Sequence, residues 1–282
     1  MIAFLGTGLL GANFTKALLA KGENVQVWNR TADKAKALEA AGAKAFDNAA
    51  DAVKGAIRIH ITLSDDAVVD AVLEQAAAGL EPGAFILDHT TTSAEGAILR
   101  TKKWAEKGFT YVHAPVFMGP VNALDSSGFM LISENEEITK KVSPWLSAMT
   151  GKLLSFGNTT GKAAGIKLIG NLFLLTLTGG LSDMLALAKS LNISGNEIST
   201  LFESFNPGAA APSRLKRLMQ ADYDNPSWEL QMARKDARLM MEAAAKGNNS
   251  LVLVPQIAKE MDRFLAKDFA HKDWSIIVSE NL

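Results

Sequence analysis

The chain has 282 residues, of which 48% are hydrophobic and 21% are charged, as in soluble globular proteins with a substantial core. It has 29 lysines and arginines against 30 aspartates and glutamates, and this near-neutral balance predicts neither a nucleic-acid nor a membrane partner. The absence of cysteine excludes disulfides, zinc–thiolate sites and thiol nucleophiles, and the four histidines lack metal-ligand spacing. We therefore expect no metal site.

Short apolar runs alternate with helical patterns through the first half of the chain. No basic segment precedes the first run, Ile2–Leu5, so we expect no targeting peptide and a cytoplasmic protein. The expected strands are Ile2–Leu5, Asn24–Trp28, Ile57–Thr62, Ala84–Leu87 and Thr110–Val112, followed by Phe129–Ile132 and Lys152–Phe156. The expected helices between them are Gly11–Lys21, Ala32–Ala41, Asp66–Ala77 and Ala94–Lys107. This alternation predicts an α/β fold with a parallel, doubly wound sheet.

After about Gly161 the pattern becomes almost entirely helical. We therefore expect an α/β domain over residues 1–160 and an all-α domain over residues 161–282. Further helical signals are a capping box at Ser194-Gly195-Asn196-Glu197, first-turn prolines at Pro212 and Pro255, and an amphipathic pattern over Trp228–Lys246.

A long apolar helix is expected over Ala163–Leu191. Its segment Leu168–Ala188 is apolar enough to suggest a membrane span, but Asn171 and Asp183 inside it favour a soluble helix buried on most sides. One small helical domain cannot cover so much apolar surface, so we expect a homodimer or homotetramer.

The first expected strand runs into a glycine-rich loop, Gly6-Thr7-Gly8-Leu9-Leu10-Gly11, and a helix follows. A GxGxxG sequence is weak evidence alone, but this position between strand and helix is that of a dinucleotide-binding Rossmann loop. Gly6 permits the tight turn, Gly8 lets the backbone approach a pyrophosphate, and Gly11 lets the helix pack closely on the strand. The free N–H groups of the helix would bind the phosphates. A glycine-rich turn without a ligand is the alternative.

The end of the second strand bears on the choice of cofactor. An NAD site normally has an acidic residue there, whereas this chain has Asn29, Arg30 and Thr31. A guanidinium makes paired, charge-assisted bonds with a 2′-phosphate, so Arg30 predicts NADP(H). The alternative is that Arg30 is a solvated charge and that Asn29 and Thr31 cap the next helix.

Several motifs follow one another along nearly the whole chain. They are Gly6–Gly11, Val27–Thr31, Leu63-Ser64-Asp65, Asp88–Thr92, His113–Val116, Lys167–Asn171, Lys235-Asp236 and Asp273-Trp274-Ser275. In this order they resemble the motifs of β-hydroxyacid dehydrogenases, which include 3-hydroxyisobutyrate dehydrogenases and glyoxylate/succinic semialdehyde reductases. Each motif is modest alone, whereas the ordered combination is specific.

The resemblance implies that Lys167 is the catalytic lysine and that Asn171 is the asparagine one helical turn later. The two residues are four apart, so they share one helical face, and both are polar in a helix built for burial. A buried ammonium is costly unless it is paired or used, and a neighbouring amide can orient it without adding charge. The alternative is that Lys167 extends to solvent near the start of its helix.

The resemblance also implies cofactor and substrate contacts. Thr91 corresponds to a threonine close to the nicotinamide, and Leu63 lies in a motif of the cofactor site. Lys235 and Asp236 correspond to a pair at the cleft between cofactor and substrate. Trp228 is a candidate for the cleft lining, and a core tryptophan is the alternative.

One loop departs from the family's pattern. Members typically carry Ser-Gly-Gly after Ala-Pro-Val, and that loop holds a substrate carboxylate, whereas here Phe117, Met118 and Gly119 follow Val116. Large apolar side chains cannot anchor an anion, so a small β-hydroxyacid is not the expected substrate. The alternative is that Phe117 and Met118 turn into the core and leave the backbone free to bind.

His89 and His113 fall at strand ends that should face the same cleft, and either could titrate near neutral pH. We expect ordinary hydrogen bonds at both positions, because Lys167 already fills the acid–base role.

The sequence thus predicts reversible hydride transfer between NADP(H) and a small carbonyl or alcohol compound, with Lys167 as general acid or base. An imine reductase is the nearest alternative, because its Rossmann half is similar, including the Asn-Arg-Thr segment. Lys167 argues against it, since that family generally replaces this lysine, while Phe117 and Met118 argue mildly for it. A cofactor-binding sensor without catalysis is a further alternative, and the presence of Lys167 and Asn171 disfavours it.

Overall fold

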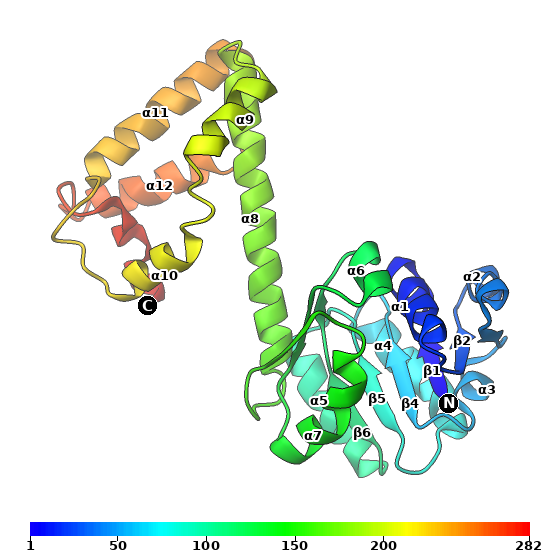
Figure 1. Ribbon diagram of the computed structural model, residues 1–282. Helices are drawn as coiled ribbons and strands as arrows, with labels where there is room; N and C mark the ends of the chain where they lie inside the picture. The colour runs from blue at the N-terminus through cyan, green and yellow to red at the C-terminus, as the bar shows by residue number, and fades with distance from the viewer. The chain divides into compact units, whose positions relative to one another are not determined.

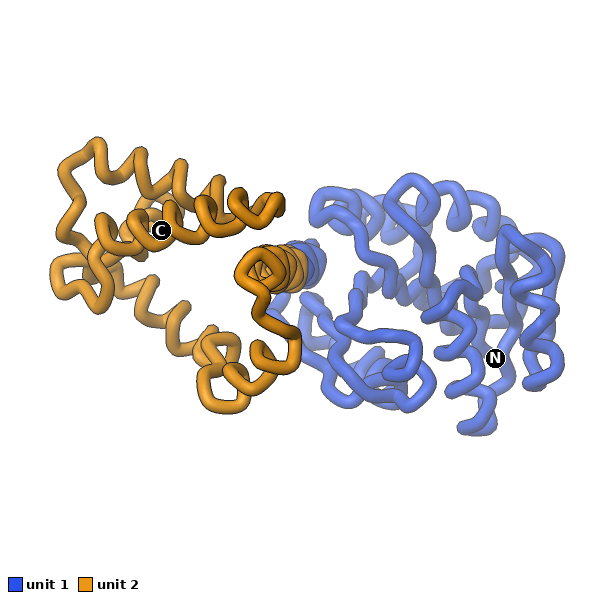
Figure 2. Tube along the Cα trace, turned by 90° about the horizontal axis from the view of Figure 1, so that it is seen from above, with its two compact units in different colours: residues 1–171 blue, residues 172–282 orange.

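The computed structural model describes all residues from Met1 to Leu282, and the chain forms two compact units. The first unit covers Met1–Asn171 and the second covers Leu172–Leu282 (Figure 2). Helix α8, Lys162–Ser190, begins in the first unit and continues in the second. The division falls inside this helix, and the domain boundary at residue 160 stays a prediction.

The first unit is built on a parallel sheet of six strands in the order β3-β2-β1-β4-β5-β6 (Figure 1). The strands are β1 Ile2–Leu5, β2 Val25–Trp28, β3 Lys44–Ala45, β4 Arg58–Ile61, β5 Phe85–Asp88 and β6 Thr110–His113. The strand order reverses at β1, which pairs with both β2 and β4, and ligands of doubly wound sheets bind at such a switch point. The predicted Rossmann fold is confirmed. Strand β3 was missed because its two residues form no apolar run.

Helices cover both faces of this sheet. They are α1 Leu9–Ala20, α2 Ala32–Lys36, α3 Ala49–Val53, α4 Asp66–Ala76 and α5 Ala94–Glu106, with short 3-10 turns at Glu39–Ala41 and Ala77–Gly79. Alternate residues of β1 face opposite layers: Phe4 packs in the same core as Phe14 of α1, whereas Leu5 packs in the core that contains α3 and α4. The expected helix over Ala32–Ala41 is shorter in α-helical form, because α2 ends at Lys36.

The expected late strands form a second, smaller sheet rather than an extension of the first. Strand β8, Phe129–Ile132, pairs antiparallel with β7, Val116–Phe117, and parallel with β9, Lys152–Ser155. Helix α6, Pro120–Asp125, follows β7, and helix α7, Glu136–Ser147, follows β8. The Ser133 hydroxyl at the end of β8 accepts a hydrogen bond from the Ala163 N–H at 3.0 Å, which fixes the start of α8 beside this sheet.

The expectation that α8 is buried on most sides is wrong for a single chain. Many of its apolar side chains are exposed, including Ile169, Leu172 and Leu175 at 67%, 62% and 72%. The helix is long and apolar enough to cross a membrane, but one such helix is weak evidence, since core helices of soluble proteins have the same length and composition. The helix is apolar on most sides, and the rest of its own chain packs against only part of that surface.

The second unit is helical. Besides α8 it contains α9 Gly195–Ser204, α10 Ala211–Met219, α11 Leu230–Lys246, α12 Val254–Leu265 and a 3-10 segment Trp274–Asn281. The capping box of α9 is present, with Ser194 and Glu197 bonding reciprocally. The Asp183 carboxylate on α8 accepts backbone N–H groups of Val252, Leu253 and Val254, so it caps the start of α12.

Candidate active site

Two adjoining hollows lie along the carboxyl ends of the central strands of the first unit. The Arg30 hollow, of about 630 Å³, includes Gly6, Asn29, Arg30, Thr31 and Lys34 in its lining. The Lys167 hollow, of about 390 Å³, is lined by Gly8–Gly11, His89–Thr91, Val116, Met118 and Lys167. Both hollows include Gly8, Thr62, Leu63 and Ser64, so together they form one groove at the switch point of the sheet.

The three glycines of the first loop have different surroundings. Gly6 has φ of +94°, and a Cβ there would lie 2.2 Å from the Thr62 carbonyl oxygen. A Cβ at Gly11 would lie 1.9 Å from the Gly6 carbonyl oxygen, so α1 packs directly on the loop. Nothing lies within 4 Å of the corresponding position at Gly8, which caps α1 and faces the groove. This is the geometry that a bound pyrophosphate requires.

Asn29 joins the glycine loop to the end of β2. Its Oδ1 accepts the Thr7 N–H at 3.0 Å, and its Nδ2 donates to the Thr31 carbonyl oxygen at 3.0 Å. Because the side chain is an amide, it holds the loop without placing a negative charge in the Arg30 hollow. Arg30 and Lys34 line that hollow, and neither forms an ion pair. Sequence reasoning missed Lys34, although its position four residues after Arg30 was the available signal.

Lys167 is a buried cation without a counter-ion. Its side chain is only 8% exposed, and its Nζ donates to Asn171 Oδ1 at 3.0 Å and lies 4.2 Å from the centre of the Phe117 ring. Burial lowers the pKa of Lys167 below its ordinary value of 10.5. An amide and an aromatic face orient the ammonium but cannot neutralise it, so this group can both hold and release a proton within the groove.

Phe117 and Met118 have different surroundings. A Cβ at Gly170 would lie 2.3 Å from Phe117 Cζ, so the ring fills the space beside this glycine of α8, underneath Lys167. Met118 lines the Lys167 hollow and also packs against the core of the sheet. The Gly119 N–H, at the start of α6, donates to Asn122 Oδ1 at 2.9 Å, so this N–H is already used within the chain.

Two histidines form a buried pair, and one of them, His89, lines the Lys167 hollow. His89 Nδ1 lies 2.9 Å from the Ala114 carbonyl oxygen, and His89 Nε2 lies 2.9 Å from His60 Nδ1. The carbonyl can only accept, so neutral His89 carries its proton on Nδ1 and accepts from His60 through Nε2. Burial lowers the pKa of His89 to about 4 and the pKa of His60 well below 6.5. His113 bonds to the Thr90 carbonyl oxygen and to Thr92. Hydrogen bonds account for both ring nitrogens of His89 and for Nε2 of His113, whereas the buried Nδ1 of His113 has no partner. Burial also lowers the pKa of His113 below 6.5, so both rings are neutral at pH 7.

The groove brings together most of the residues that the sequence singled out. Those that line it are Gly6, Gly8, Leu9, Leu10, Gly11, Asn29, Arg30, Thr31, Leu63, Thr91, Met118 and Lys167. Three further residues do not line the groove but contact residues that do. Thr7 bonds to Asn29, and Phe117 and Asn171 contact Lys167. Trp228, Lys235 and Asp236 belong to the second unit, where Trp228 packs edge-on against Trp274 and Lys235 pairs with Asp236 at 3.0 Å. Their roles stay predictions.

Residues 1–157, more than half of the chain, match the family model described as NAD binding domain of 6-phosphogluconate dehydrogenase. Among curated relatives, 2-(hydroxymethyl)glutarate dehydrogenase of Eubacterium barkeri is 23% identical over 98% of this chain and 93% of its own. Glyoxylate/succinic semialdehyde reductase 1 of Arabidopsis thaliana is 27% identical over 93% of this chain and 91% of its own. The chain belongs to the β-hydroxyacid dehydrogenase family.

As a member of the β-hydroxyacid dehydrogenase family, the chain is an oxidoreductase with a nicotinamide-dinucleotide-binding domain. It also spans about half the length of the human cytokine-like nuclear factor N-PAC, with 26% identity over 98% of this chain and 50% of that protein.

Solved structures share the fold of this β-hydroxyacid dehydrogenase family member. An imine reductase from Myxococcus stipitatus in complex with NADP+ has a TM-score of 0.90 at 20% identity and covers 99% of both chains. A 3-hydroxyisobutyrate dehydrogenase from Mycobacterium tuberculosis has a TM-score of 0.67 at 22% identity, covering 99% of this chain and 98% of its own.

The buried His89 predicts a pH dependence of stability. Its pKa of about 4 in the folded state lies below the value of about 6.5 in an unfolded chain, so its contribution is complete above pH 6.5 and is lost as the pH falls toward 4. Between pH 7 and pH 5 this site should cost about 2 kcal/mol of unfolding free energy. Urea unfolding at pH 7 and at pH 5 measures this loss. The unfolding free energy of His89→Gln should fall less between the two pH values than that of the unchanged protein.

The matched control for that experiment is His271→Gln, because the side chain of His271 is 80% exposed. This variant should keep the pH dependence of the unchanged protein. Equal losses in His89→Gln and in the unchanged protein would contradict the assignment of a neutral, buried His89.

Proposed function

We propose that this protein is an NADP(H)-dependent reductase that transfers hydride to a carbonyl compound, with Lys167 supplying the proton. The observation that carries the proposal is the buried, unpaired ammonium of Lys167 at one end of a groove whose other end holds Arg30. A dinucleotide with its phosphates at Gly8 would extend from the Arg30 hollow to the Lys167 hollow.

Three features support NADP(H) over NAD(H). Arg30 and Lys34 are unpaired cations in one hollow, and Asn29 occupies the position where an acid would repel a 2′-phosphate. A planar guanidinium can bind two phosphate oxygens at once, and the ammonium of Lys34 adds a point charge. The imine reductase from Myxococcus stipitatus was solved with NADP+, which agrees with this choice.

Proton transfer is assigned to Lys167 because the other titratable groups of its hollow are unsuitable. Burial keeps His89 neutral at physiological pH, and Thr90 and Thr91 are hydroxyl groups without an adjacent base in the groove. In reduction, the ammonium of Lys167 donates a proton to the oxygen of the forming alkoxide. In oxidation, the neutral amine accepts the hydroxyl proton, and the lowered pKa makes this form more accessible.

The substrate proposal rests on the loop after β7. Met118 brings an apolar side chain into the Lys167 hollow, and the Gly119 N–H is already bonded to Asn122. The loop therefore offers a carboxylate no hydroxyl group, and the Gly119 N–H is not free to bind it. We propose a bulkier or less charged carbonyl compound in place of a small β-hydroxyacid.

An imine reductase is the second candidate, favoured by Phe117 and Met118 and by the imine reductase with the same fold. Lys167 opposes it for the reason given above. A cofactor-binding protein without catalysis is the third candidate, and one relative, N-PAC, is named as a nuclear factor rather than as an enzyme. Turnover of cyclic imines but not of carbonyl compounds would favour the second, and cofactor binding without any turnover would favour the third.

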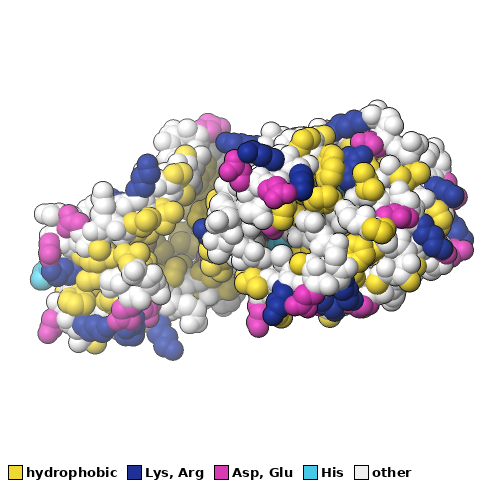
Figure 3. Space-filling model, turned by 90° about the horizontal axis from the view of Figure 1, so that it is seen from below, with side chains coloured by type: hydrophobic (Ala, Val, Ile, Leu, Met, Phe, Trp, Pro, Cys, Tyr) yellow, Lys and Arg dark blue, Asp and Glu magenta, His cyan; other side chains and the backbone are white.

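We also propose a soluble, cytoplasmic homodimer or homotetramer. The exposed apolar side chains of α8 support an oligomer, and Figure 3 shows hydrophobic side chains grouped on the helical unit with charged ones around them. Burial of this surface against a second copy would remove it from water. Light scattering over a range of concentrations should give a mass of two or four chains, and a constant monomer mass would contradict the proposal.

Replacement of Arg30 tests the cofactor proposal. The unchanged protein should bind NADPH roughly tenfold or more tightly than NADH, because a charge-assisted hydrogen bond contributes about 1.5–3 kcal/mol. Arg30→Ala should remove most of this preference in fluorescence titrations and leave NADH binding nearly unchanged. Lys36→Ala is the control, since Lys36 is an exposed cation on the same helix as Lys34 but lies outside the hollow. Equal affinity of the unchanged protein for both cofactors would reject NADP(H) preference.

Replacement of Lys167 tests the proton donor. Lys167→Ala should retain cofactor affinity and lose turnover by about 10²–10⁴-fold, the usual range for a lost general acid. Asn171→Ala should cost less, because the amide orients the lysine and transfers no proton. Lys162→Ala, an exposed position at the start of the same helix, should retain full activity. Near-full activity of Lys167→Ala would mean that water or another group protonates the product.

A substrate panel tests the role of the loop. The unchanged protein should be poor on 3-hydroxyisobutyrate and on short semialdehyde acids, and better on uncharged or aromatic aldehydes and ketones. The double variant Phe117→Ser, Met118→Gly should gain activity on the short acids. If the unchanged protein already turns over short acids with kcat/KM of about 10⁴ M⁻¹s⁻¹ or above, the loop is not a specificity element.

A further inference from the structure

A buried chain of hydrogen bonds lies behind the Lys167 hollow. Asp88 at the end of β5, Tyr111 on β6 and Arg100 on α5 are at most 2% exposed. The Tyr111 hydroxyl donates to Asp88 Oδ2 at 2.6 Å and accepts from Arg100 Nε at 3.0 Å. Burial raises the pKa of Tyr111 well above 10, so the phenol keeps its proton and the direction of both bonds is fixed.

One end of this chain reaches the lining of the groove. The other oxygen of Asp88, Oδ1, accepts the Thr90 N–H at 2.8 Å. The Thr90 hydroxyl in turn accepts the Leu63 N–H at 3.0 Å. Thr90 and Leu63 belong to the loops after β5 and β4, and both line the Lys167 hollow. Asp88 therefore fixes the position of one loop, and through Thr90 it fixes that loop against the other.

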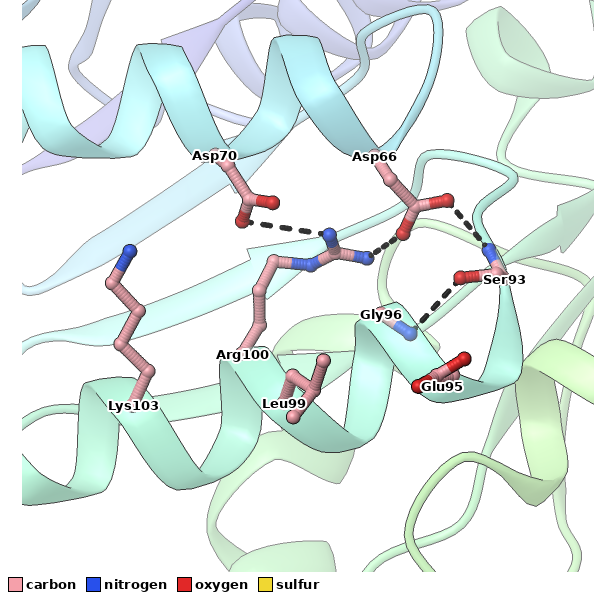
Figure 4. Close-up of a pocket in the computed structure, with 8 residues that line it drawn as sticks. All are labelled: Asp66, Asp70, Ser93, Glu95, Gly96, Leu99, Arg100 and Lys103. Carbon is pink, nitrogen blue, oxygen red and sulfur yellow. Dashed lines mark hydrogen bonds and ion pairs between the residues drawn. The ribbon is translucent and has the colours of Figure 1, made fainter.

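The other end of the chain joins the same two loops at their far ends. Arg100 reaches from α5 to α4, where its Nη2 donates to Asp66 Oδ1 at 2.6 Å and its Nη1 lies 3.5 Å from Asp70 (Figure 4). Asp66 begins α4, and its Oδ2 accepts the N–H of Ser93, the residue that caps α5, at 2.9 Å. The contacts thus form a closed ring around both loops, in which Arg100 Nη1 has the ion pair with Asp70 but no hydrogen bond.

Tyr111 is the one neutral link between the buried charges of Asp88 and Arg100. We propose that Tyr111 is a positioning residue that holds the loop after β5, which lines the Lys167 hollow and not the Arg30 hollow, in the arrangement that binds the nicotinamide half of the cofactor. Loss of its hydroxyl leaves one oxygen of buried Asp88 without a donor and Arg100 Nε without an acceptor. Asp88 is then free to turn, which loosens the Thr90 N–H contact and the pairing of Thr90 with Leu63.

The test separates the two halves of the cofactor. The test rests on the proposal that a nicotinamide dinucleotide binds in the groove, but not on the choice of NADP(H). It therefore uses the reduced dinucleotide that the unchanged protein binds more tightly. The matching fragment is 2′,5′-ADP for NADPH or ADP for NADH. In Tyr111→Phe the dissociation constant of the reduced dinucleotide should rise at least about tenfold, as expected for a lost bond to a buried charge, while that of the fragment should change less than about threefold.

Arg58→Met is the matched control. Arg58 is a mostly buried residue that pairs with Glu23 at 2.8 Å, and it lies at the first residue of β4, away from the carboxyl ends of the strands. This variant should lose stability in urea without changing either dissociation constant by more than about threefold, because its ion pair does not contact the loops.

Thr90→Val removes only the hydroxyl that accepts the Leu63 N–H, and it should reproduce the selective loss seen in Tyr111→Phe. If Tyr111→Phe does not fold, the changes in the dissociation constants of dinucleotide and fragment are compared in Thr90→Val instead. The proposal is overturned if dinucleotide affinity is unchanged, if dinucleotide and fragment lose affinity equally, or if Arg58→Met has the same effect. Loss of NADPH preference in Arg30→Ala bears only on the cofactor choice and leaves this test unaffected.

Discussion

The candidate site depends on one buried ammonium group, that of Lys167, which has no carboxylate beside it to balance its charge. Lys167 is nearly fully buried, and its neighbours are an amide oxygen and an aromatic ring. Each stabilises a cation less than a carboxylate would. Burial therefore lowers the pKa of Lys167 below that of a solvated lysine. A carboxylate at either position would hold the proton more tightly and weaken the residue as an acid. The bulky Phe117 thus contacts both the ammonium of Lys167 and the helix at Gly170.

Much of the first unit could be predicted from the sequence because its signals are local. Buried parallel strands read as apolar runs, and the glycines of the first loop stand where the backbone needs a positive φ or a close approach. Lys167 and Asn171 could be paired because helical spacing alone places them on one face. The place of Arg30 in the lining of the groove could be predicted from its position after the second strand.

Other features depend on contacts between distant segments, which periodicity does not reveal. The pairing of Thr90 with Leu63 and the link from Arg100 through Tyr111 to Asp88 join residues far apart in sequence. The packing of Phe117 beside Gly170 is of the same kind, and neither residue type signals it. The exposure of α8 could not be read from its composition, because an apolar helix reads alike whether its own chain or a second copy covers it.

The central claim is that Lys167 donates the proton in reduction. The most direct measurement is the pH dependence of kcat/KM for reduction of a good carbonyl substrate, since it reports the free enzyme's essential acid. The ammonium is the active form, so the rate should be constant at low pH and fall as pH rises through the pKa of Lys167, at a value below 10.5. This fall should be absent from the residual activity of Lys167→Met. A rate that stays constant to pH 10.5, or the same fall in Lys167→Met, would contradict the account.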